Sequence, residues 1–395
     1  MRNVEKKNTV RLILRGQTNN FGNTIYDYAN KLVITGLGSQ ASYFMGIYQM
    51  SETIVGIIFD ILGGITADQK NRKQILVFTD LVAALATFIV FLQYSKKNVW
   101  LLVITNIILA ILYSFNSPTY KAIVKDLLSK QNIYKYNSYS KTISEIISVC
   151  SPLVGMVIVS FFGFKYGMLI NSLSFLISAI LEWQFKVIVP LTTQKKTAKE
   201  SKLQSLKSGL AYIYGNKELL VVLIASSLIN FFLAGYNFSV PFTNHMARFS
   251  HMYAYVLVAE SVGNIAGALF NSFWNKDLRI AQYSHFLFGV GVTTLVVPLL
   301  QLYWPLILVF FGLSSACLTI FNIQMMSGIQ AEVADDFIGR VFGVIFTIAV
   351  LFMPVGTYVF SLLNIKNWLV FSVIGIGEVL VYIFMFGAIK LVQTK

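Results

Sequence analysis

The stretch that decides the fold is residues 64–73, which read Gly64-Ile65-Thr66-Ala67-Asp68-Gln69-Lys70-Asn71-Arg72-Lys73. It lies between the second and third of twelve apolar stretches, and it packs small residues, one carboxylate and three basic residues into one short loop. Of the 395 residues, 56% are hydrophobic and 12% are charged, whereas soluble domains carry about 25% charged residues. The sequence therefore predicts a protein that crosses a membrane many times, without a large soluble domain.

A helix needs roughly 20 mostly apolar residues to cross a bilayer, so twelve spans use nearly the whole chain. We expect an all-α membrane protein with transmembrane helices near 11–35, 43–66, 75–95, 99–119, 140–163, 166–186, 218–243, 252–274, 280–302, 304–327, 340–363 and 367–390. With the N-terminus inside, 24 Lys and Arg residues fall in cytoplasmic segments and five in outside loops. This bias predicts a multi-pass protein of the cell membrane with both termini in the cytoplasm.

The two halves of the chain repeat each other at offsets that drift from 210 to 202 residues. The matched positions are Asn20 with Asn230, Tyr26 with Tyr236, Asp27 with Asn237, Glu52 with Glu260, and Pro152 with Pro354. The repeat predicts two six-helix bundles, 1–190 and 215–395, related by a pseudo-twofold axis. Parallel repeats of this kind place the substrate site at their interface. Residues 191–214 form a cytoplasmic linker, in which 200–214 is either an amphipathic surface helix or a solvated segment that binds anionic lipid.

At this point the sequence resembles the major facilitator superfamily. Gly64, Ala67, Asp68, Arg72 and Lys73 match the signature of that family between helices two and three. The segments 115–137, 163–181 and 328–343 resemble its macrolide-efflux-like branch, although 151–156 lacks the outer glycines of the helix-five motif of the antiporters. The resemblance implies the major facilitator fold and secondary transport.

The resemblance also implies a conformational switch at the signature loop. A carboxylate at the end of helix two can face the positive N-terminal end of a helix in the other half. We expect Asp68 to approach the start of helix eleven and Arg340 in the outward-facing state, and to leave it in the inward-facing state. The predicted switch residues are Gly64, Asp68, Arg72, Lys73 and Arg340.

The first span carries a polar face, because Gly16, Asn20, Asn23, Asp27 and Asn30 recur at spacings of three and four residues. Such a stripe is costly against lipid, so we expect it to line a water-filled cavity. Asp27 and Lys31 are four residues apart and can form an ion pair. That pair either neutralises the helix for insertion, or leaves Asp27 to bind a cationic substrate or a proton.

Two further carboxylates, Glu52 and Glu260, lie about eight or nine residues inside predicted spans, where a buried carboxylate can carry a proton. Together with the repeated polar positions, the candidates for substrate binding or proton coupling are Asn20, Asn23, Tyr26, Asp27, Glu52, Asn230, Tyr236, Asn237 and Glu260. We expect Asp80 and Glu182 to pair with Arg72 or nearby lysines, and Glu145 to pair with Lys141. The sequence gives no role to Glu378.

We interpret the chain as a proton-coupled exporter of small amphipathic compounds such as macrolide-type drugs, working by alternating access. Two alternatives stay open: a facilitator or exporter of a siderophore, sugar or peptide, or a non-transporting sensor or immunity protein. The expected partners are a small-molecule substrate, protons and membrane lipids, and we expect a monomer. No nucleotide-binding pattern or metal-ligand spacing is present. We therefore predict no enzyme activity, no cofactor, no metal and no nucleic-acid partner.

Overall fold

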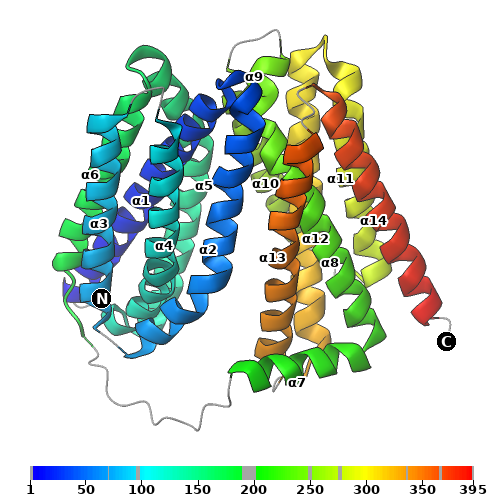
Figure 1. Cartoon of the computed structure of the whole chain (residues 1–395). Coiled ribbons are helices and arrows are strands. Elements are labelled where there is room, and N and C mark those ends of the chain that lie inside the picture. The colour runs from blue at the N-terminus through cyan, green and yellow to red at the C-terminus, as the bar shows by residue number, and fades with distance from the viewer. Residues whose placement is uncertain are drawn as a thin grey trace. The chain divides into compact units, whose positions relative to one another are not determined.

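The computed structural model describes residues 3–69, 71–94, 98–188, 202–247, 251–274, 278–334, 337–363 and 367–393. Every regular element in these residues is a helix, and the helices run up and down side by side in each part of the chain (Figure 1). The chain divides into two compact units, Met1–Lys195 (unit 1) and Lys196–Lys395 (unit 2). The predicted bundles, 1–190 and 215–395, stay a prediction in their bounds and in their symmetry.

Unit 1 contains six long helices: α1 (Asn3–Thr35), α2 (Ala41–Gln69), α3 (Arg72–Gln93), α4 (Val99–Leu127), α5 (Lys130–Phe161) and α6 (Phe164–Trp183). A short 3-10 turn, η1 (Gly38–Gln40), precedes α2. Helix α1 packs against α5 and α6, α2 packs against α4, and α3 packs against α4 and α6.

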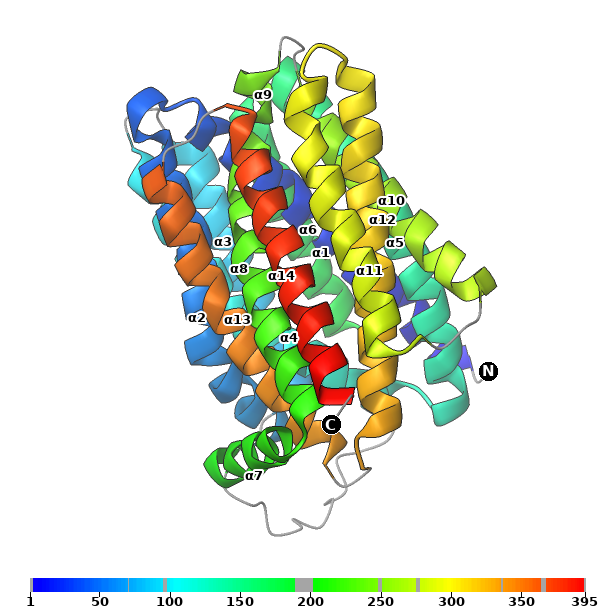
Figure 2. The same cartoon turned by 90° about the vertical axis from the view of Figure 1, so that its right-hand side faces the viewer.

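Unit 2 begins with the short helix α7 (Lys202–Gly215). Its long helices are α8 (Lys217–Ser239), α10 (Met252–Trp274), α11 (Ile280–Val296), α12 (Trp304–Glu332), α13 (Ile338–Leu363) and α14 (Leu369–Gln393). The turns η2 (Val240–Phe242) and η3 (Val297–Leu300) and the single-turn helix α9 (Thr243–Met246) complete it (Figure 2). Helix α8 packs against α13 and α14, α10 against α12, and α11 against α12 and α14. In chain order, these are the same pairings as in unit 1.

Glycine allows the closest of these helix pairs to touch through their backbones. A Cβ atom on Gly63 of α2 would lie 1.8 Å from the Ser114 carbonyl oxygen of α4, and one on Gly263 of α10 would lie 2.0 Å from the Gly312 carbonyl oxygen of α12. Small residues permit such close contact between membrane helices. Each unit therefore contains one helix pair that tolerates no side chain at its crossing point.

Ten of the described helices are long and apolar enough to cross a membrane. Helices α1 and α2, of 33 and 29 residues, are not among these ten. A helix of 33 residues measures about 50 Å, so the length of α1 is sufficient, and its polar side chains set it apart. The structure thus supports a multi-span protein, and the count of twelve spans stays a prediction for α1 and α2.

Several helices extend beyond their apolar stretches, which is where the predicted boundaries differ most. The fifth span was expected to begin at 140, but α5 begins at Lys130, and α4 continues from the expected end at 119 to Leu127. The carboxylate of Glu5, near the start of α1, accepts hydrogen bonds from the Ser129 amide at 3.0 Å and from Asn132 at 2.8 Å. Hydropathy marks the apolar part of a helix, whereas capping contacts of this kind determine where the helix itself begins.

The start of α1 also joins the ends of two other helices. The Asn8 side-chain amide donates to the Leu127 carbonyl at the end of α4 (3.2 Å) and to the Lys186 carbonyl just after α6 (2.8 Å). Together with the start of α5, which Glu5 contacts, four chain segments therefore meet at this end of unit 1.

Of the two alternatives for residues 200–214, the structure contains the helix, α7, at the end of unit 2 where α13 begins (Figures 1 and 2). The Tyr212 ring stacks on Phe337 with centroids 4.7 Å apart, and Ile213 is fully buried. A Cβ on Gly209 would lie 2.7 Å from the Arg340 carbonyl oxygen. Helix α7 is thus packed closely against the start of α13.

Candidate functional site

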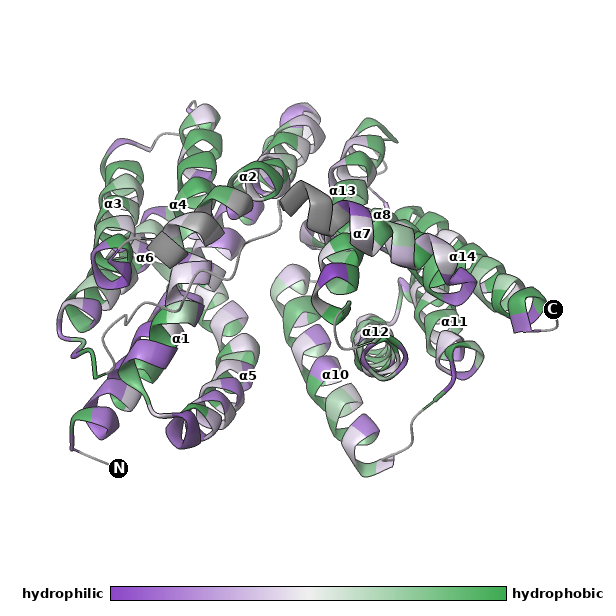
Figure 3. Ribbon diagram, turned by 90° about the horizontal axis from the view of Figure 1, so that it is seen from below, coloured by the Kyte–Doolittle hydropathy of each residue, from purple (hydrophilic) through white to green (hydrophobic). Residues whose placement is uncertain are grey.

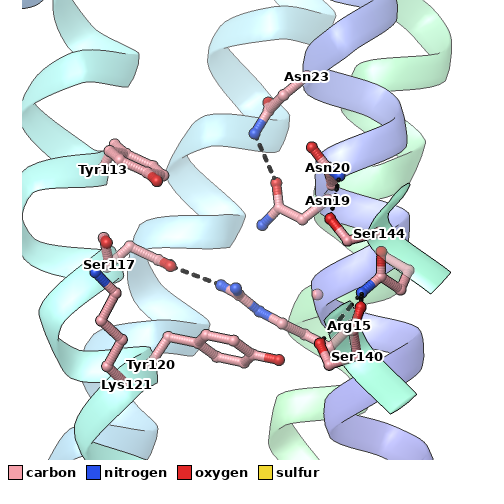
Figure 4. Close-up of a pocket in the computed structure, with 13 residues that line it drawn as sticks. Arg15, Asn19, Asn20, Asn23, Tyr113, Ser117, Tyr120, Lys121, Ser140 and Ser144 are labelled. Carbon is pink, nitrogen blue, oxygen red and sulfur yellow. Dashed lines mark hydrogen bonds between the residues drawn. The ribbon is translucent and has the colours of Figure 1, made fainter. Parts of the chain in front are cut away.

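A polar cavity of about 320 Å³ lies inside unit 1, between side chains of α1, α4 and α5 (Figure 4). Helix α1 supplies one guanidinium and four amides, α4 supplies hydroxyl groups, an amide and a lysine, and α5 supplies two hydroxyl groups. The lining residues are Arg15, Gly16, Gln17, Asn19, Asn20, Asn23, Tyr113, Asn116, Ser117, Tyr120, Lys121, Ser140 and Ser144. The lining contains no carboxylate, so its charge and hydrogen-bond donors suit the oxygen-bearing groups of a polar solute.

The predicted polar face of α1 accounts for much of this lining. Asn20 donates to Ser144 Oγ at 3.3 Å, and Asn23 donates to Asn19 Oδ1 at 3.1 Å. Hydrophilic residues mark α1 and α5 in Figure 3, whereas α3 is mainly hydrophobic. The spacing of three and four residues in the sequence therefore brought Asn20 and Asn23 to one cavity.

A buried charge network adjoins the cavity, and Arg15 of α1 is its centre. Its Nε donates to Glu182 Oε1 of α6 at 2.6 Å, and a terminal nitrogen lies 3.2 Å from Asp80 Oδ2 of α3. The side chains of Arg15, Asp80 and Glu182 are 5%, 2% and 0% exposed. We call these three residues the triad. Ion pairs so far from water need good geometry and further hydrogen bonds to offset the cost of desolvation.

Two residues of α4 complete the network. Asn116 accepts a hydrogen bond from Arg15 at 2.7 Å and donates to Asp80 Oδ1 at 2.8 Å. The ring of Tyr120 lies under the guanidinium, 4.3 Å from its carbon to the centroid, and the Tyr120 hydroxyl donates to the Leu12 carbonyl at 2.7 Å. Figure 4 shows Arg15 reaching from α1 toward Tyr120.

The expected partners of Asp80 and Glu182 were wrong. Both carboxylates pair with Arg15, whereas Arg72 binds Asp126 at the end of α4 through two contacts of 2.8 and 2.9 Å. Sequence reasoning missed the triad because its members lie 65 and 167 residues apart. One signal was available: all three charges fall inside predicted spans, where charged residues need partners.

The predicted pair of Asp27 and Lys31 is confirmed, with Lys31 Nζ 2.7 Å from Asp27 Oδ2. The Tyr48 hydroxyl donates to Asp27 Oδ1 at 3.4 Å. Glu52 is exposed and close enough to Asp27 and Lys31 to interact with both electrostatically. Two predicted candidates, Asp27 and Glu52, therefore lie in one region of unit 1, together with Lys31, the partner of Asp27.

Tyr26 lies away from the residues that line this cavity. It is 4% exposed and packs in an apolar cluster with Ala29, Val90, Leu102 and Met168. Its part in substrate binding or proton coupling stays a prediction.

In unit 2, Tyr236 contacts one other repeated position, Glu260. Its hydroxyl donates to Glu260 Oε1 at 2.5 Å, and its ring contacts Phe311 and Phe371 edge to face. Glu378, to which the sequence gave no role, is 3% exposed, and its Oε2 has no hydrogen-bond partner among the described residues.

The other two candidates of unit 2 are Asn230 and Asn237. Asn230 is half-buried and donates to the Ser226 carbonyl of its own helix at 3.0 Å. Asn237 is exposed.

The switch residues are described only in part. The side chain of Asp68 lies outside the described residues, so its contact with Arg340 stays a prediction. Gly64 is half-buried in α2, and Lys73 donates to the Phe185 carbonyl at 3.2 Å. The guanidinium carbon of Arg340 lies 5.3 Å from the centroid of the Phe337 ring. Among the described residues, no group of three His, Cys, Asp or Glu side chains could hold a metal ion.

Comparisons with known proteins agree with this architecture. The chain is 24% identical over 326 residues to macrolide efflux protein A of Streptococcus pyogenes, covering 78% of each protein. It is 24% identical over 324 residues to macrolide efflux protein A of Enterococcus faecalis, covering 78% of this chain and 98% of that protein.

Solved structures share the fold at low sequence identity. A bacterial homologue of the human lysosomal transporter Spinster, in an inward-facing and unoccupied conformation, superposes with a TM-score of 0.76 at 11% identity, covering 99% of this chain and 98% of the other. The nucleoside transporter NupG superposes with a TM-score of 0.73 at 15% identity, covering 98% and 99%. The family model of the Major Facilitator Superfamily matches residues 18–357. The predicted resemblance is confirmed, and the chain belongs to the Major Facilitator Superfamily.

Proposed function

We propose that this transporter exports small amphipathic compounds, such as macrolides, in exchange for protons. In this proposal both termini are cytoplasmic, and two six-helix halves, 1–190 and 215–395, alternate between outward-facing and inward-facing states. The polar cavity in unit 1 carries the proposal, because it is lined by three helices of a membrane protein and is rich in hydrogen-bond donors. Its volume is at the lower end of the range for ligand pockets, roughly 300–1,000 Å³.

The substrate class rests on the relatives. Macrolide efflux protein A from two species matches most of this chain. Macrolides combine an apolar ring with hydroxyl-bearing sugars, and the amides and hydroxyl groups that line the cavity suit those sugars. We therefore choose a macrolide, erythromycin, as the first probe.

The free energy that one proton releases is sufficient to drive export of the solute. One charge that crosses 100 mV releases about 2.3 kcal/mol. Because about 1.4 kcal/mol corresponds to a factor of ten, one proton at that voltage sustains a gradient of roughly 50-fold.

The proposal is tested in a bacterial host that lacks its own drug pumps. Expression of the chain should raise the erythromycin concentration that stops growth and should lower the accumulation of radiolabelled erythromycin. Ser140→Leu places an apolar side chain at the cavity wall and should abolish both effects. Ser138→Leu is the matched control, since Ser138 is exposed two residues earlier on the same helix. Wild-type resistance no greater than that of the empty host would refute macrolide export.

The donor-rich lining of the cavity also favours a second candidate, a transporter of hydroxylated solutes such as sugars or nucleosides. Proteoliposomes separate the two candidates. Erythromycin uptake that is driven by an imposed pH gradient (acid inside) supports export by antiport. Uptake of radiolabelled xylose or uridine that ignores the gradient supports a facilitator. No flux of any probe supports a non-transporting sensor or immunity protein.

A further inference from the structure

We propose that the triad of Arg15, Asp80 and Glu182 is a proton-binding site, in which one proton shared by the two carboxylates is taken up and released during transport. The inference rests on the proposed proton-coupled function and assigns its proton to residues outside the candidates that the sequence suggested. It is carried by charge balance, burial and the position of Arg15 at the cavity wall.

The first argument is the charge balance of the triad. One guanidinium faces two carboxylates, so the ionised triad carries one net negative charge, and all three side chains are 5% exposed or less. Within the described part of the chain, Arg15 is the only cation paired with either carboxylate. An uncompensated charge buried away from water is costly, and the usual solution is to neutralise the group. One proton makes the triad neutral.

The second argument is the geometry of the two carboxylates. Both contact the same guanidinium, Glu182 Oε1 at 2.6 Å from Nε and Asp80 Oδ2 at 3.2 Å from a terminal nitrogen. Glu182 Oε2 is buried and receives no hydrogen bond from a described residue. Two ionised carboxylates so close repel each other, whereas a single proton between them turns the contact into a hydrogen bond. Asp80 accepts hydrogen bonds from Arg15 and Asn116, whereas Glu182 Oε2 accepts none from a described residue, so Glu182 is the carboxylate that takes the proton.

Other ionisable groups around the triad do not supply the missing positive charge. On α1, the half-buried Arg11 donates to the Gln184 carbonyl at 2.7 Å. On α4, Tyr120 is in contact with Arg15, and Lys121 is exposed at the cavity. On α5, the Tyr136 hydroxyl lies 3.0 Å from that of Tyr120.

The third argument connects the proton to the solute. Arg15 and Asn116 belong both to the triad network and to the lining of the cavity. The ionised triad places one extra negative charge behind the cavity wall, so a cationic solute binds the cavity more strongly when the triad is ionised than when it is protonated, although Lys121 adds a positive charge to the lining. Uptake of a proton removes that charge, so proton and cationic solute compete for the same unit. Competition of this kind is what exchange of a proton for a solute requires.

The experiment uses proteoliposomes that contain the full-length protein, and it measures their uptake of radiolabelled erythromycin. In the wild type, a pH gradient drives uptake. In Glu182→Gln, which cannot exchange a proton there, we expect erythromycin exchange at zero gradient to continue, while the gradient-driven part is lost. Glu145→Gln is the matched control, because it removes a carboxylate from a partly exposed pair on α5 and should keep both activities.

A second measurement does not depend on any solute. Infrared difference spectra of the purified protein between acidic and alkaline buffer should contain the carbonyl band of a protonated carboxylic acid. Glu182→Gln should remove the part of this band that comes from one buried acid, whereas Glu145→Gln should keep that part. If Glu182→Gln does not fold, Asp80→Asn takes its place, and if neither folds, the wild-type spectrum decides.

The outcomes separate the two ideas. A wild type that transports without responding to the gradient refutes the proposed proton coupling. A wild type that responds, together with a Glu182→Gln variant that responds equally, overturns the triad as the proton site. An infrared titration of the wild type without any buried-acid band overturns it as well.

Discussion

Removing the cation from the triad should destabilise unit 1 strongly. Arg15→Met keeps most of the side-chain volume but leaves Asp80 and Glu182 buried without a positive partner. Removing one partner of a buried ion pair costs about 3–5 kcal/mol. For a unit of this size, 1 kcal/mol lowers the melting temperature by roughly 2–4 °C. The expected loss is therefore roughly 6–20 °C.

The assay is thermal unfolding of the detergent-purified protein, followed by size-exclusion chromatography after heating. The triple variant Arg15→Met, Asp80→Asn, Glu182→Gln should recover much of the loss, because removing all the charges of a buried network together is often neutral. Lys141→Met breaks the exposed pair with Glu145 and should lower the melting temperature little, since exposed pairs contribute about 0–1 kcal/mol. The reasoning fails if Arg15→Met melts with the wild type, or if the triple variant melts no higher than the single one.

Two further changes probe other parts of the molecule. Asp27→Asn should leave the melting temperature nearly unchanged, because its pair with Lys31 is partly exposed and worth at most about 1 kcal/mol; erythromycin efflux that also stays unchanged would limit Asp27 to a neutralising role. Gly209→Leu should push α7 away from α13 and speed trypsin cleavage within α7, whereas Ala211→Leu, at an exposed position of the same helix, should not. Equal cleavage of the two variants would contradict the close packing of α7.

The fold was predictable to the extent that lipid imposes it. Apolar stretches of about 20 residues revealed most of the helices, whereas the lysine-rich linker left a helix and a solvated segment as alternatives for the residues of α7. The start of α5 at Lys130 was not predictable from hydropathy, since that turn is polar and is held by Glu5 from 124 residues away. Helix ends that depend on such distant contacts leave no local trace in the sequence.

The candidate site, like the fold, could be predicted only in part. Asn20 and Asn23 lie on one helix, so periodicity alone placed them together, and they line the cavity. Tyr26 was chosen because it repeats at 236, but a repeated residue can serve packing in one copy and hydrogen bonding in the other. The triad joins three helices. The sequence shows that each of these helices carries a charged residue, but it does not show that the three residues pair with one another.

The long separation between Arg15 and its two carboxylates has a consequence for biosynthesis. The ribosome delivers α1 to the membrane before α3 and α6 exist, so Arg15, near the start of the predicted first span, is synthesised before either carboxylate is available to pair with it. The contacts of Asn8 with residues near the ends of α4 and α6 must also wait for those helices. The nascent α1 therefore has to stay at the translocon or at the membrane surface until α6 has been synthesised. The first helix to be synthesised is among the last of its unit to complete its packing contacts.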